Sequence, residues 1–179
     1  MNNQITVHPS GCSASGAINS VDMLVELVVQ RLALGQDVAA AKYVSRQPID
    51  DLARERVIMD SVARVLSDTG ASREIGLQFF RDQIEANKVI QRGLHHRWYA
   101  HPDEVPAVGG NLPTQVRPKL DRITGQMLRQ FMHLGDVPQL MRGHIEDMLD
   151  KRLTAMPRRQ LPGLHRTAAL FALRSLCSE

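Results

Sequence analysis

Aromatic side chains are scarce in this sequence and make up only 4% of its residues. Few aromatic rings leave few platforms on which nucleic-acid bases stack. Charge of one sign is not concentrated either, since the net charge is +3 and no run of five or more like charges occurs. This mild basic bias suits a small anionic ligand at least as well as nucleic acid, and the scarcity of aromatics favours the small anion.

Long apolar runs are also missing. None approaches the about 18 residues that a membrane-crossing helix requires, so we expect no membrane span. Residues 1–16 contain neither a basic leader nor an apolar core, and we therefore expect no intact signal peptide in this chain. The two cysteines, Cys12 and Cys177, lack metal or redox spacing. They either form one disulfide in an oxidising compartment or remain two thiols.

Strict two-residue alternation of apolar and polar residues is absent, and so are clusters of β-branched residues. Apolar residues instead recur at helical spacing. The length of 179 residues fits one domain, and 43% hydrophobic with 23% charged residues is typical of globular proteins. We predict an all-α fold, a single-domain bundle of about six helices.

Capping residues, glycines and prolines divide the chain. Residues 1–18 predict a flexible N-terminal arm, and residues 101–116 predict a long loop with a functional or wrapping role. Gly35 lies inside the first helix, but the apolar ladder continues in register across it. The expected helices run from Asn19 or Ser20 to about Arg46, from Ile49 to Asp68, from Ser72 to about 100, from Pro118 to about 134, from about 139 to Met156, and from Pro162 to near Cys177.

Two cations lie on the apolar stripe of the first helix rather than opposite it. Arg31 and Lys42 are eleven residues apart, which separates them by about 16 Å along a helix axis. Both should therefore project from one inward face. The apolar members of that stripe are Leu24, Leu27, Val28, Leu34, Val38 and Ala41.

The next two helices add further inward polar residues. Asn87 and Gln91, four apart, share one side of the third helix. Because buried charges without partners cost several kcal/mol, such residues either pair with one another or await a ligand of opposite sign. Packing explains any one of them, but it explains the whole set poorly. On the second helix, Asp51, Arg54 and Glu55 lie along or beside an apolar ladder of Leu52, Ile58, Met59, Val62 and Leu66.

Other chemistries find little support. His95 and His96, with His101 nearby, lack the spacing and acidic or thiolate partners of a zinc site, so we interpret them as solvated residues at a helix end. The Gly109-Gly110 pair is not followed by the Lys-Ser or Lys-Thr of a phosphate loop. No nucleophile elbow or protease signature occurs. We therefore expect no metal and no cofactor.

Three segments resemble the active-site segments of the all-helical chorismate mutases. They read RL-x9-K, PIDDLARERVI and FFRDQIEANKVIQ, and their spacings agree with that family. The segment NLPTQVRPKLDRITGQML resembles the extra helical half of the exported, monofunctional subclass, which supplies from its own chain an arginine that shorter members take from a partner. The resemblance implies a chorismate mutase type II-like domain over residues 19–179, with active-site helices at 19–100 and a C-terminal half at 117–179.

The resemblance implies a cofactor-free Claisen-type rearrangement of chorismate to prephenate, a step of aromatic amino-acid biosynthesis. By that resemblance Arg31 and Arg117 hold the substrate carboxylates, Lys42 reaches a carboxylate and the ether oxygen, and Gln91 donates to the same oxygen. Exported relatives often carry an acid at the Gln91 position. Asp51, Arg54 and Glu55 would line the side that receives the ring hydroxyl. Asn87 would help to bind a carboxylate, at a position where relatives often have Ser or Thr. Ile58 stands where some exported relatives have a polar residue.

The same resemblance implies a homodimer with each site complete in one chain, and a periplasmic or secreted location. The expected lack of a signal peptide leaves a cytoplasmic location open. The alternative interpretation is a non-catalytic helical binding protein for a small anion or nucleic acid. A nucleic-acid binder displays its cations outward, so the inward register of Arg31 and Lys42 favours the enzyme.

Overall fold

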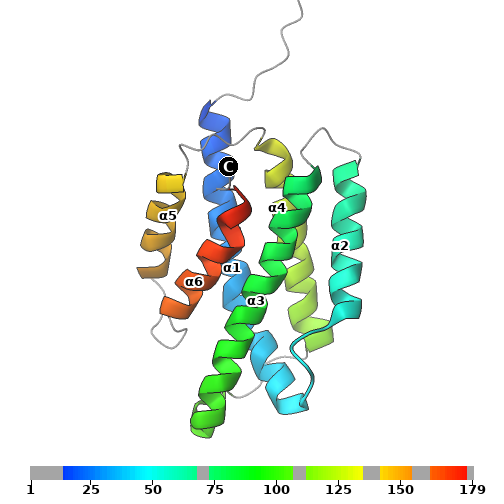
Figure 1. Cartoon of the computed structure of the whole chain (residues 1–179), viewed down its shortest axis with the longest axis vertical. Helices are drawn as coiled ribbons and strands as arrows, with labels where there is room; N and C mark the ends of the chain where they lie inside the picture. The colour runs from blue at the N-terminus through cyan, green and yellow to red at the C-terminus, as the bar shows by residue number, and fades with distance from the viewer. Residues whose placement is uncertain (1–13, 68–72, 107–111, 135–141, 155–161, 177–179) are drawn as a thin grey trace, which may run out of the picture.

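The computed structural model describes residues 14–67, 73–106, 112–134, 142–154 and 162–176 (Figure 1). These residues form six α-helices joined or extended by short helical turns, and no strand occurs among them. The predicted all-α class and the number of helices are confirmed. In chain order the helices are α1 (Ala14–Ser45), α2 (Leu52–Ser67), α3 (Arg73–Ala100), α4 (Arg117–His133), α5 (Arg142–Thr154) and α6 (Pro162–Leu173), with the short turns η1 (Pro102–Glu104), η2 (Leu112–Val116) and η5 (Arg174–Leu176).

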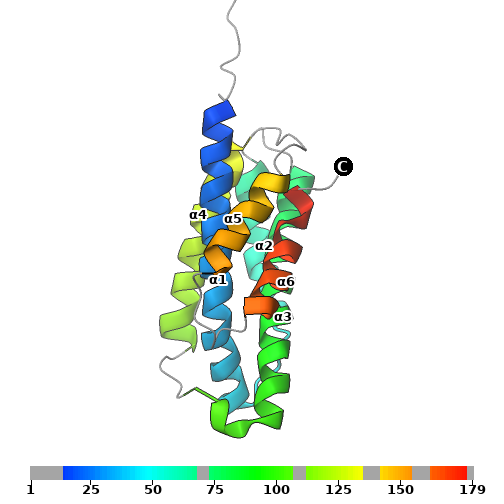
Figure 2. The same cartoon turned by 90° about the vertical axis from the view of Figure 1, so that its left-hand side faces the viewer.

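The two longest helices, α1 and α3, run beside each other along the long axis of the molecule (Figures 1 and 2). α4, α5 and α6 all pack on α1, and α3 also contacts α2 and α6. Apolar side chains of these helices form one main core that includes Leu24, Val28, Phe79, Phe80, Met127, Leu149 and Ala172. Helices α1 and α3 are thus held on several sides, which makes them a rigid support for a site.

Helix α1 continues through Gly35 without a break, as the apolar ladder predicts. A Cβ atom at Gly35 would lie 3.0 Å from Cγ2 of Ile90 and 3.2 Å from Nδ2 of Asn87. Glycine at this position therefore permits the close approach of α3. The expected start at Asn19 or Ser20 is wrong, because α1 begins at Ala14. Ser20 is buried inside the helix, so packing overrides its preference for a cap.

The C-terminus of α1 is closed by a Schellman motif just before Pro48. The backbone N–H of Gln47 donates to the carbonyl of Lys42 over 3.0 Å, and that of Arg46 donates to the carbonyl of Tyr43 over 3.3 Å. Arg46 has a φ angle of 56°, in the left-handed region where glycine is favoured. The motif turns the chain sharply toward the start of α2.

Two expectations about loops and ladders need correction. The predicted loop at 101–116 contains the turns η1 and η2, while residues 107–111 lie outside the described part of the chain. Leu112 and Val116 of η2 are buried against Val38, so this segment packs as part of the bundle. Leu52 was expected in the apolar ladder of the second helix, but 71% of its surface is exposed. It is the first residue of α2, beyond the reach of the neighbouring helices.

Replacing Arg46 with Gly should stabilise the fold. Glycine adopts a positive φ without steric cost, so we expect the free energy of unfolding to rise by about 0.5–1 kcal/mol. Urea denaturation followed by circular dichroism measures this change. Arg46→Ala is the matched control, because it removes the same exposed side chain but keeps the strained backbone. An equal gain in both variants would contradict the role of the φ angle.

Candidate active site

One pocket lies between α1, the start of α2, the middle of α3 and the segment where η2 passes into α4. All eight residues that the sequence singled out line this pocket. It therefore brings together side chains from four separate parts of the chain. The eight residues are Arg31, Lys42, Asp51, Arg54, Glu55, Asn87, Gln91 and Arg117, and the other lining residues are Val38, Ile49, Ile58, Ile84, Lys88, Leu112 and Leu120.

Arg31 is the most enclosed cation of the pocket, with an exposed fraction of 5%. Its Nη1 donates to the Thr124 hydroxyl over 2.9 Å and to the Leu120 carbonyl over 3.4 Å. Within the described segments it forms no salt bridge, and its buried Nε has no hydrogen-bond partner there. Burial lowers the pKa of Arg31 to about 10, partly offset by the negative charge of Asp121. The guanidinium is still positive at neutral pH and lacks a full counter-charge.

Lys42, exposed by 6%, lies on the same inward face, as predicted. Its Nζ donates to the carbonyl of Ile49 over 2.5 Å, which ties the end of α1 to the connection between α1 and α2. Burial lowers the pKa of Lys42, and the nearby Asp51 opposes that shift. Two of the three N–H groups of this ammonium have no partner among the residues described.

Asp51 and Glu55 cap the start of α2. The Asp51 carboxylate accepts the backbone N–H of Arg54 over 3.1 Å, and Glu55 accepts the backbone N–H of Asp51 over 3.2 Å. This reciprocal arrangement resembles a capping box shifted by one residue. Both acids therefore have a structural role in addition to lining the pocket.

The two remaining arginines are paired with acids of other segments. Nη2 of Arg117, the first residue of α4, donates to Oδ2 of Asp51 over 2.9 Å. Nη2 of Arg54 pairs with Oδ1 of Asp121. The prediction started the fourth helix at Pro118, but it begins one residue earlier at Arg117, because η2 leads into it without an open loop. These pairs draw α4 toward the beginning of α2 and close one side of the pocket.

Asn87 and Gln91 are both buried on the predicted inward side of α3. Nδ2 of Asn87 donates to the carbonyl of Arg31 over 3.3 Å, and Nε2 of Gln91 donates to Oδ1 of Asn87 over 2.8 Å. The amide oxygen of Gln91 is buried without a partner in the described part of the chain. A chain of amides thus runs from the α1 backbone into the pocket.

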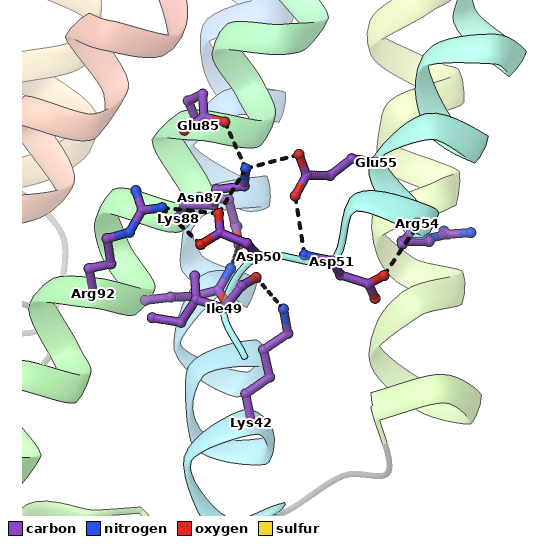
Figure 3. A network of polar contacts seen from close by, with 11 residues as sticks. Lys42, Ile49, Asp50, Asp51, Arg54, Glu55, Glu85, Asn87, Lys88 and Arg92 are labelled. Atoms are coloured by element: carbon purple, nitrogen blue, oxygen red, sulfur yellow. Dashed lines mark hydrogen bonds and ion pairs between the residues drawn. The ribbon is translucent and has the colours of Figure 1, made fainter. Parts of the chain in front are cut away.

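Lys88 also lines the pocket, although it was not among the predicted site residues. Figure 3 shows its ammonium group among acids from the α1–α2 connection, α2 and α3. Asp121 and Thr124 of α4 were missed too, and both contact predicted arginines. Lys88 had a sequence signal, since it follows Ile84 by four residues and precedes Gln91 by three, on the same helical face.

The histidines of α3 do not behave alike. His96 and His101 are exposed, as expected. His95 is half-buried, because Nε2 lies 2.9 Å from the Ala39 carbonyl oxygen and its ring centroid lies 5.2 Å from that of Tyr43. The expectation that His95 is solvated is therefore wrong. No cluster of metal-binding side chains and no helix long and apolar enough to cross a membrane occurs in the segments that the structure describes.

Known proteins resemble the chain in sequence and in fold. The sequence model of the family described as chorismate mutase type II matches residues 15–92. A chorismate mutase of Methanocaldococcus jannaschii is 32% identical over 76 residues, covering 42% of this chain and 77% of that protein. A secreted chorismate mutase of Mycolicibacterium smegmatis is 28% identical over 160 residues, which cover 86% of this chain and 84% of that protein. The crystal structure of a chorismate mutase from Burkholderia thailandensis matches with a TM-score of 0.76 and 30% identity, over 89% of this chain and 99% of that one.

These matches cover different parts of the molecule. The family model covers α1, α2, most of α3 and the connections between them, which carry every predicted site residue except Arg117. The Mycolicibacterium and Burkholderia proteins extend the similarity into the C-terminal half. Since a relative at 30% identity is covered almost completely, the similarity is not confined to one motif. The chain belongs to the type II chorismate mutase family.

Proposed function

We propose that this protein is a chorismate mutase, which converts chorismate to prephenate without a cofactor. The observation that carries the proposal is the convergence of four cationic side chains on one pocket of a single chain. They come from α1, α2 and α4, and the amides of Asn87 and Gln91 accompany them from α3. These four cations are Arg31, Lys42, Arg54 and Arg117, and a fifth, Lys88, lines the pocket from α3.

The reaction matches what such a pocket supplies. It is a unimolecular rearrangement of a dianion, in which one C–O bond breaks while a C–C bond forms. It needs neither a nucleophile nor a proton transfer. Catalysis must therefore come from holding the flexible substrate in its reactive shape and from stabilising the negative charge that grows on the ether oxygen. Fixed cations and amide donors do both.

Arg31 and Arg117 are proposed to bind the two carboxylates. Arg31 is buried without an ion pair to any described acid, and its Nε has no partner there, so a carboxylate would supply the missing counter-charge. Arg117 is held by Asp51 at 2.9 Å, and a substrate carboxylate would compete for it. A guanidinium binds a carboxylate with two parallel hydrogen bonds and so fixes its orientation.

Lys42 and Gln91 are proposed to stabilise the ether oxygen. The ammonium of Lys42 uses one N–H on the Ile49 carbonyl and has others to offer to the oxygen and to a carboxylate. The side-chain amide of Gln91 donates one N–H to Asn87, which leaves its second N–H for the substrate. A cation and a neutral donor would then meet the developing charge together.

Asp51, Arg54 and Glu55 are proposed to line the side that receives the ring hydroxyl, and Asn87 to assist a carboxylate. The capping hydrogen bonds hold the two acids in place before any ligand arrives. Each charge-assisted hydrogen bond contributes on the order of 1.5–3 kcal/mol. A handful of them accounts for the roughly 8 kcal/mol at the low end of enzymatic rate acceleration.

We also propose that the enzyme works outside the cytoplasm as a homodimer. The exported location is supported by the similarity to a secreted chorismate mutase over 86% of this chain. The dimer remains a prediction from the family resemblance, and light scattering after gel filtration measures it. A site supplied entirely by one chain predicts that dilution to a monomer, if it occurs, leaves specific activity unchanged.

Replacing Arg31 or Lys42 with Ala should abolish most activity and preserve the fold. Loss of a fixed donor to a developing charge lowers turnover by roughly 100-fold or more. The loss of chorismate absorbance, measured without any added cofactor, reports activity, and far-ultraviolet circular dichroism reports the helices. Arg64→Ala removes an exposed cation of α2 and serves as the control. A fully active Arg31→Ala or Lys42→Ala variant would rule out the assigned role.

Activity should be nearly constant from about pH 6 to 8, because the Gln91 amide donates without titrating. Burial lowers the pKa of Lys42, so its positive charge is lost as the pH rises, and at a lower pH than for an exposed lysine. We therefore expect activity to fall on the alkaline side. Gln91→Glu is the matched variant, since a glutamate donates only when protonated, and its activity should decrease as the pH rises from 6 to 8. A wild-type profile that falls steeply across that range would contradict this role of Gln91.

A further inference from the structure

We infer that Lys88 is a positioning residue of this enzyme, which holds the segment from Ile49 to Glu55 in the geometry that the pocket requires. The inference rests on the proposed chorismate mutase activity and extends it to a residue that does not bind substrate. Lys88 acts through its contacts with Asp50, Glu55 and Glu85.

The contacts of Lys88 join three parts of the chain. Its Nζ lies 3.1 Å from Oδ1 of Asp50, 2.9 Å from Oε2 of Glu55 and 2.8 Å from Oε1 of Glu85. Figure 3 shows these carboxylates arranged around the ammonium group. The lysine side chain is only 8% exposed, whereas Asp50 and Glu85 are 52% and 44% exposed. The contact with Glu55, which is 22% exposed, is therefore the one most shielded from water, and it is stronger than an ordinary surface salt bridge.

The number of partners argues against a direct role in substrate binding. An ammonium group has three N–H donors. That of Lys88 donates hydrogen bonds to Glu55 and Glu85 and forms an ion pair with Asp50. Burial lowers the pKa of Lys88, but the hydrogen bonds to Glu85, Glu55 and Asp50 raise it overall. The lysine is therefore charged, fully paired and unavailable to the substrate.

The segment that Lys88 holds carries several contacts of the pocket. The Ile49 carbonyl accepts a hydrogen bond from Lys42, and the Asp51 carboxylate accepts one from Arg117. The Glu55 carboxylate accepts the backbone N–H of Asp51. Lys88 contacts Asp50, which precedes Asp51 in the chain, and Glu55, which accepts the backbone N–H of Asp51. A shift of Asp50 or Glu55 therefore moves Asp51 too. Small displacements matter because a misplacement of about 1 Å can reduce a rate about 100-fold.

Replacing Lys88 with Met tests the inference, because Met keeps the length of the side chain and removes its charge. The carboxylates of Asp50, Glu55 and Glu85 would then repel one another. We expect kcat to fall by about tenfold to 100-fold, with a smaller change in KM, and with helical circular dichroism retained. Lys88→Arg keeps the cation and should restore at least part of kcat.

Arg92→Met is the matched control. Arg92 also holds Asp50, with Nη2 at 3.0 Å from Oδ1, but its side chain is half-exposed and it does not line the pocket. We expect this variant to retain kcat within about threefold of the wild-type value, as exposed ion pairs contribute little. A loss equal to that of Lys88→Met would attribute the effect to Asp50 alone and overturn the assignment to Lys88.

The pH profile separates positioning from general destabilisation. Glu55 is faced by Lys88 and Glu85 from α3, by Asp50 and Asp51 from the connection, and by the charge of Lys42 from α1. Without Lys88, only Arg92, which pairs with Asp50, and Lys42 oppose these acids, so protonation at low pH should relieve their repulsion. We expect Lys88→Met to recover activity as the pH falls from about 8 to 5.5, while the wild type does not.

The outcomes distinguish the two proposals. A wild-type protein that does not consume chorismate would refute the proposed function. An active wild type with an equally active Lys88→Met variant would refute only the inference about Lys88. The inference would also be refuted if Lys88→Met lost activity at every pH and Lys88→Arg did not restore it, since removal of the cation would then not be the cause.

Discussion

A guanidinium group that is buried without an ion pair to any acid of the described residues is the constraint on which the pocket depends. Removing Arg31 from water costs several kcal/mol, and within the described residues only a hydroxyl and a carbonyl of α4 contact it. Val28 and Leu32, which lie close to Arg31 along α1, are buried too, and Arg31 itself is only 5% exposed. Among the described residues the charge of Arg31 is balanced only in part, by the nearby Asp121, so an anionic ligand can supply the rest.

The acids around the pocket partly balance the charges of the cations other than Arg31 and also hold those cations in place. Asp51 caps α2 and also holds Arg117, while Glu55 accepts the backbone of Asp51 and pairs with Lys88. Because each carboxylate meets two requirements, few acids suffice to orient several donors. Such fixed dipoles and charges stabilise a transition state without the cost of reorganising at the moment of reaction. The same arrangement links the stability of the start of α2 to the geometry of the site.

Local patterns predicted the helices and most of the site. Helical spacing placed Arg31, Lys42, Asn87 and Gln91 on inward faces, and their burial confirms it. The same spacing failed for Leu52, and the interpretation of His95 as a solvated residue at a helix end was wrong too. Leu52 lies at a helix start where no neighbour covers it, and His95 is covered by α1 through Ala39 and Tyr43. In both cases the outcome depends on a neighbouring element, which the periodicity of one helix does not describe.

The sequence by itself determined the all-α class, the helical faces and the candidate set of charged residues, because these follow from spacing within single helices. Only the tertiary structure decided which charges meet. Arg31 reaches a hydroxyl 93 residues away, and Arg117 reaches a carboxylate 66 residues away. Lys88 likewise depends on Glu55, 33 residues before it. Contacts of this kind arise from the packing of α1, α2, α3 and α4, since a charge has no preferred partner until the fold brings one within a few ångströms.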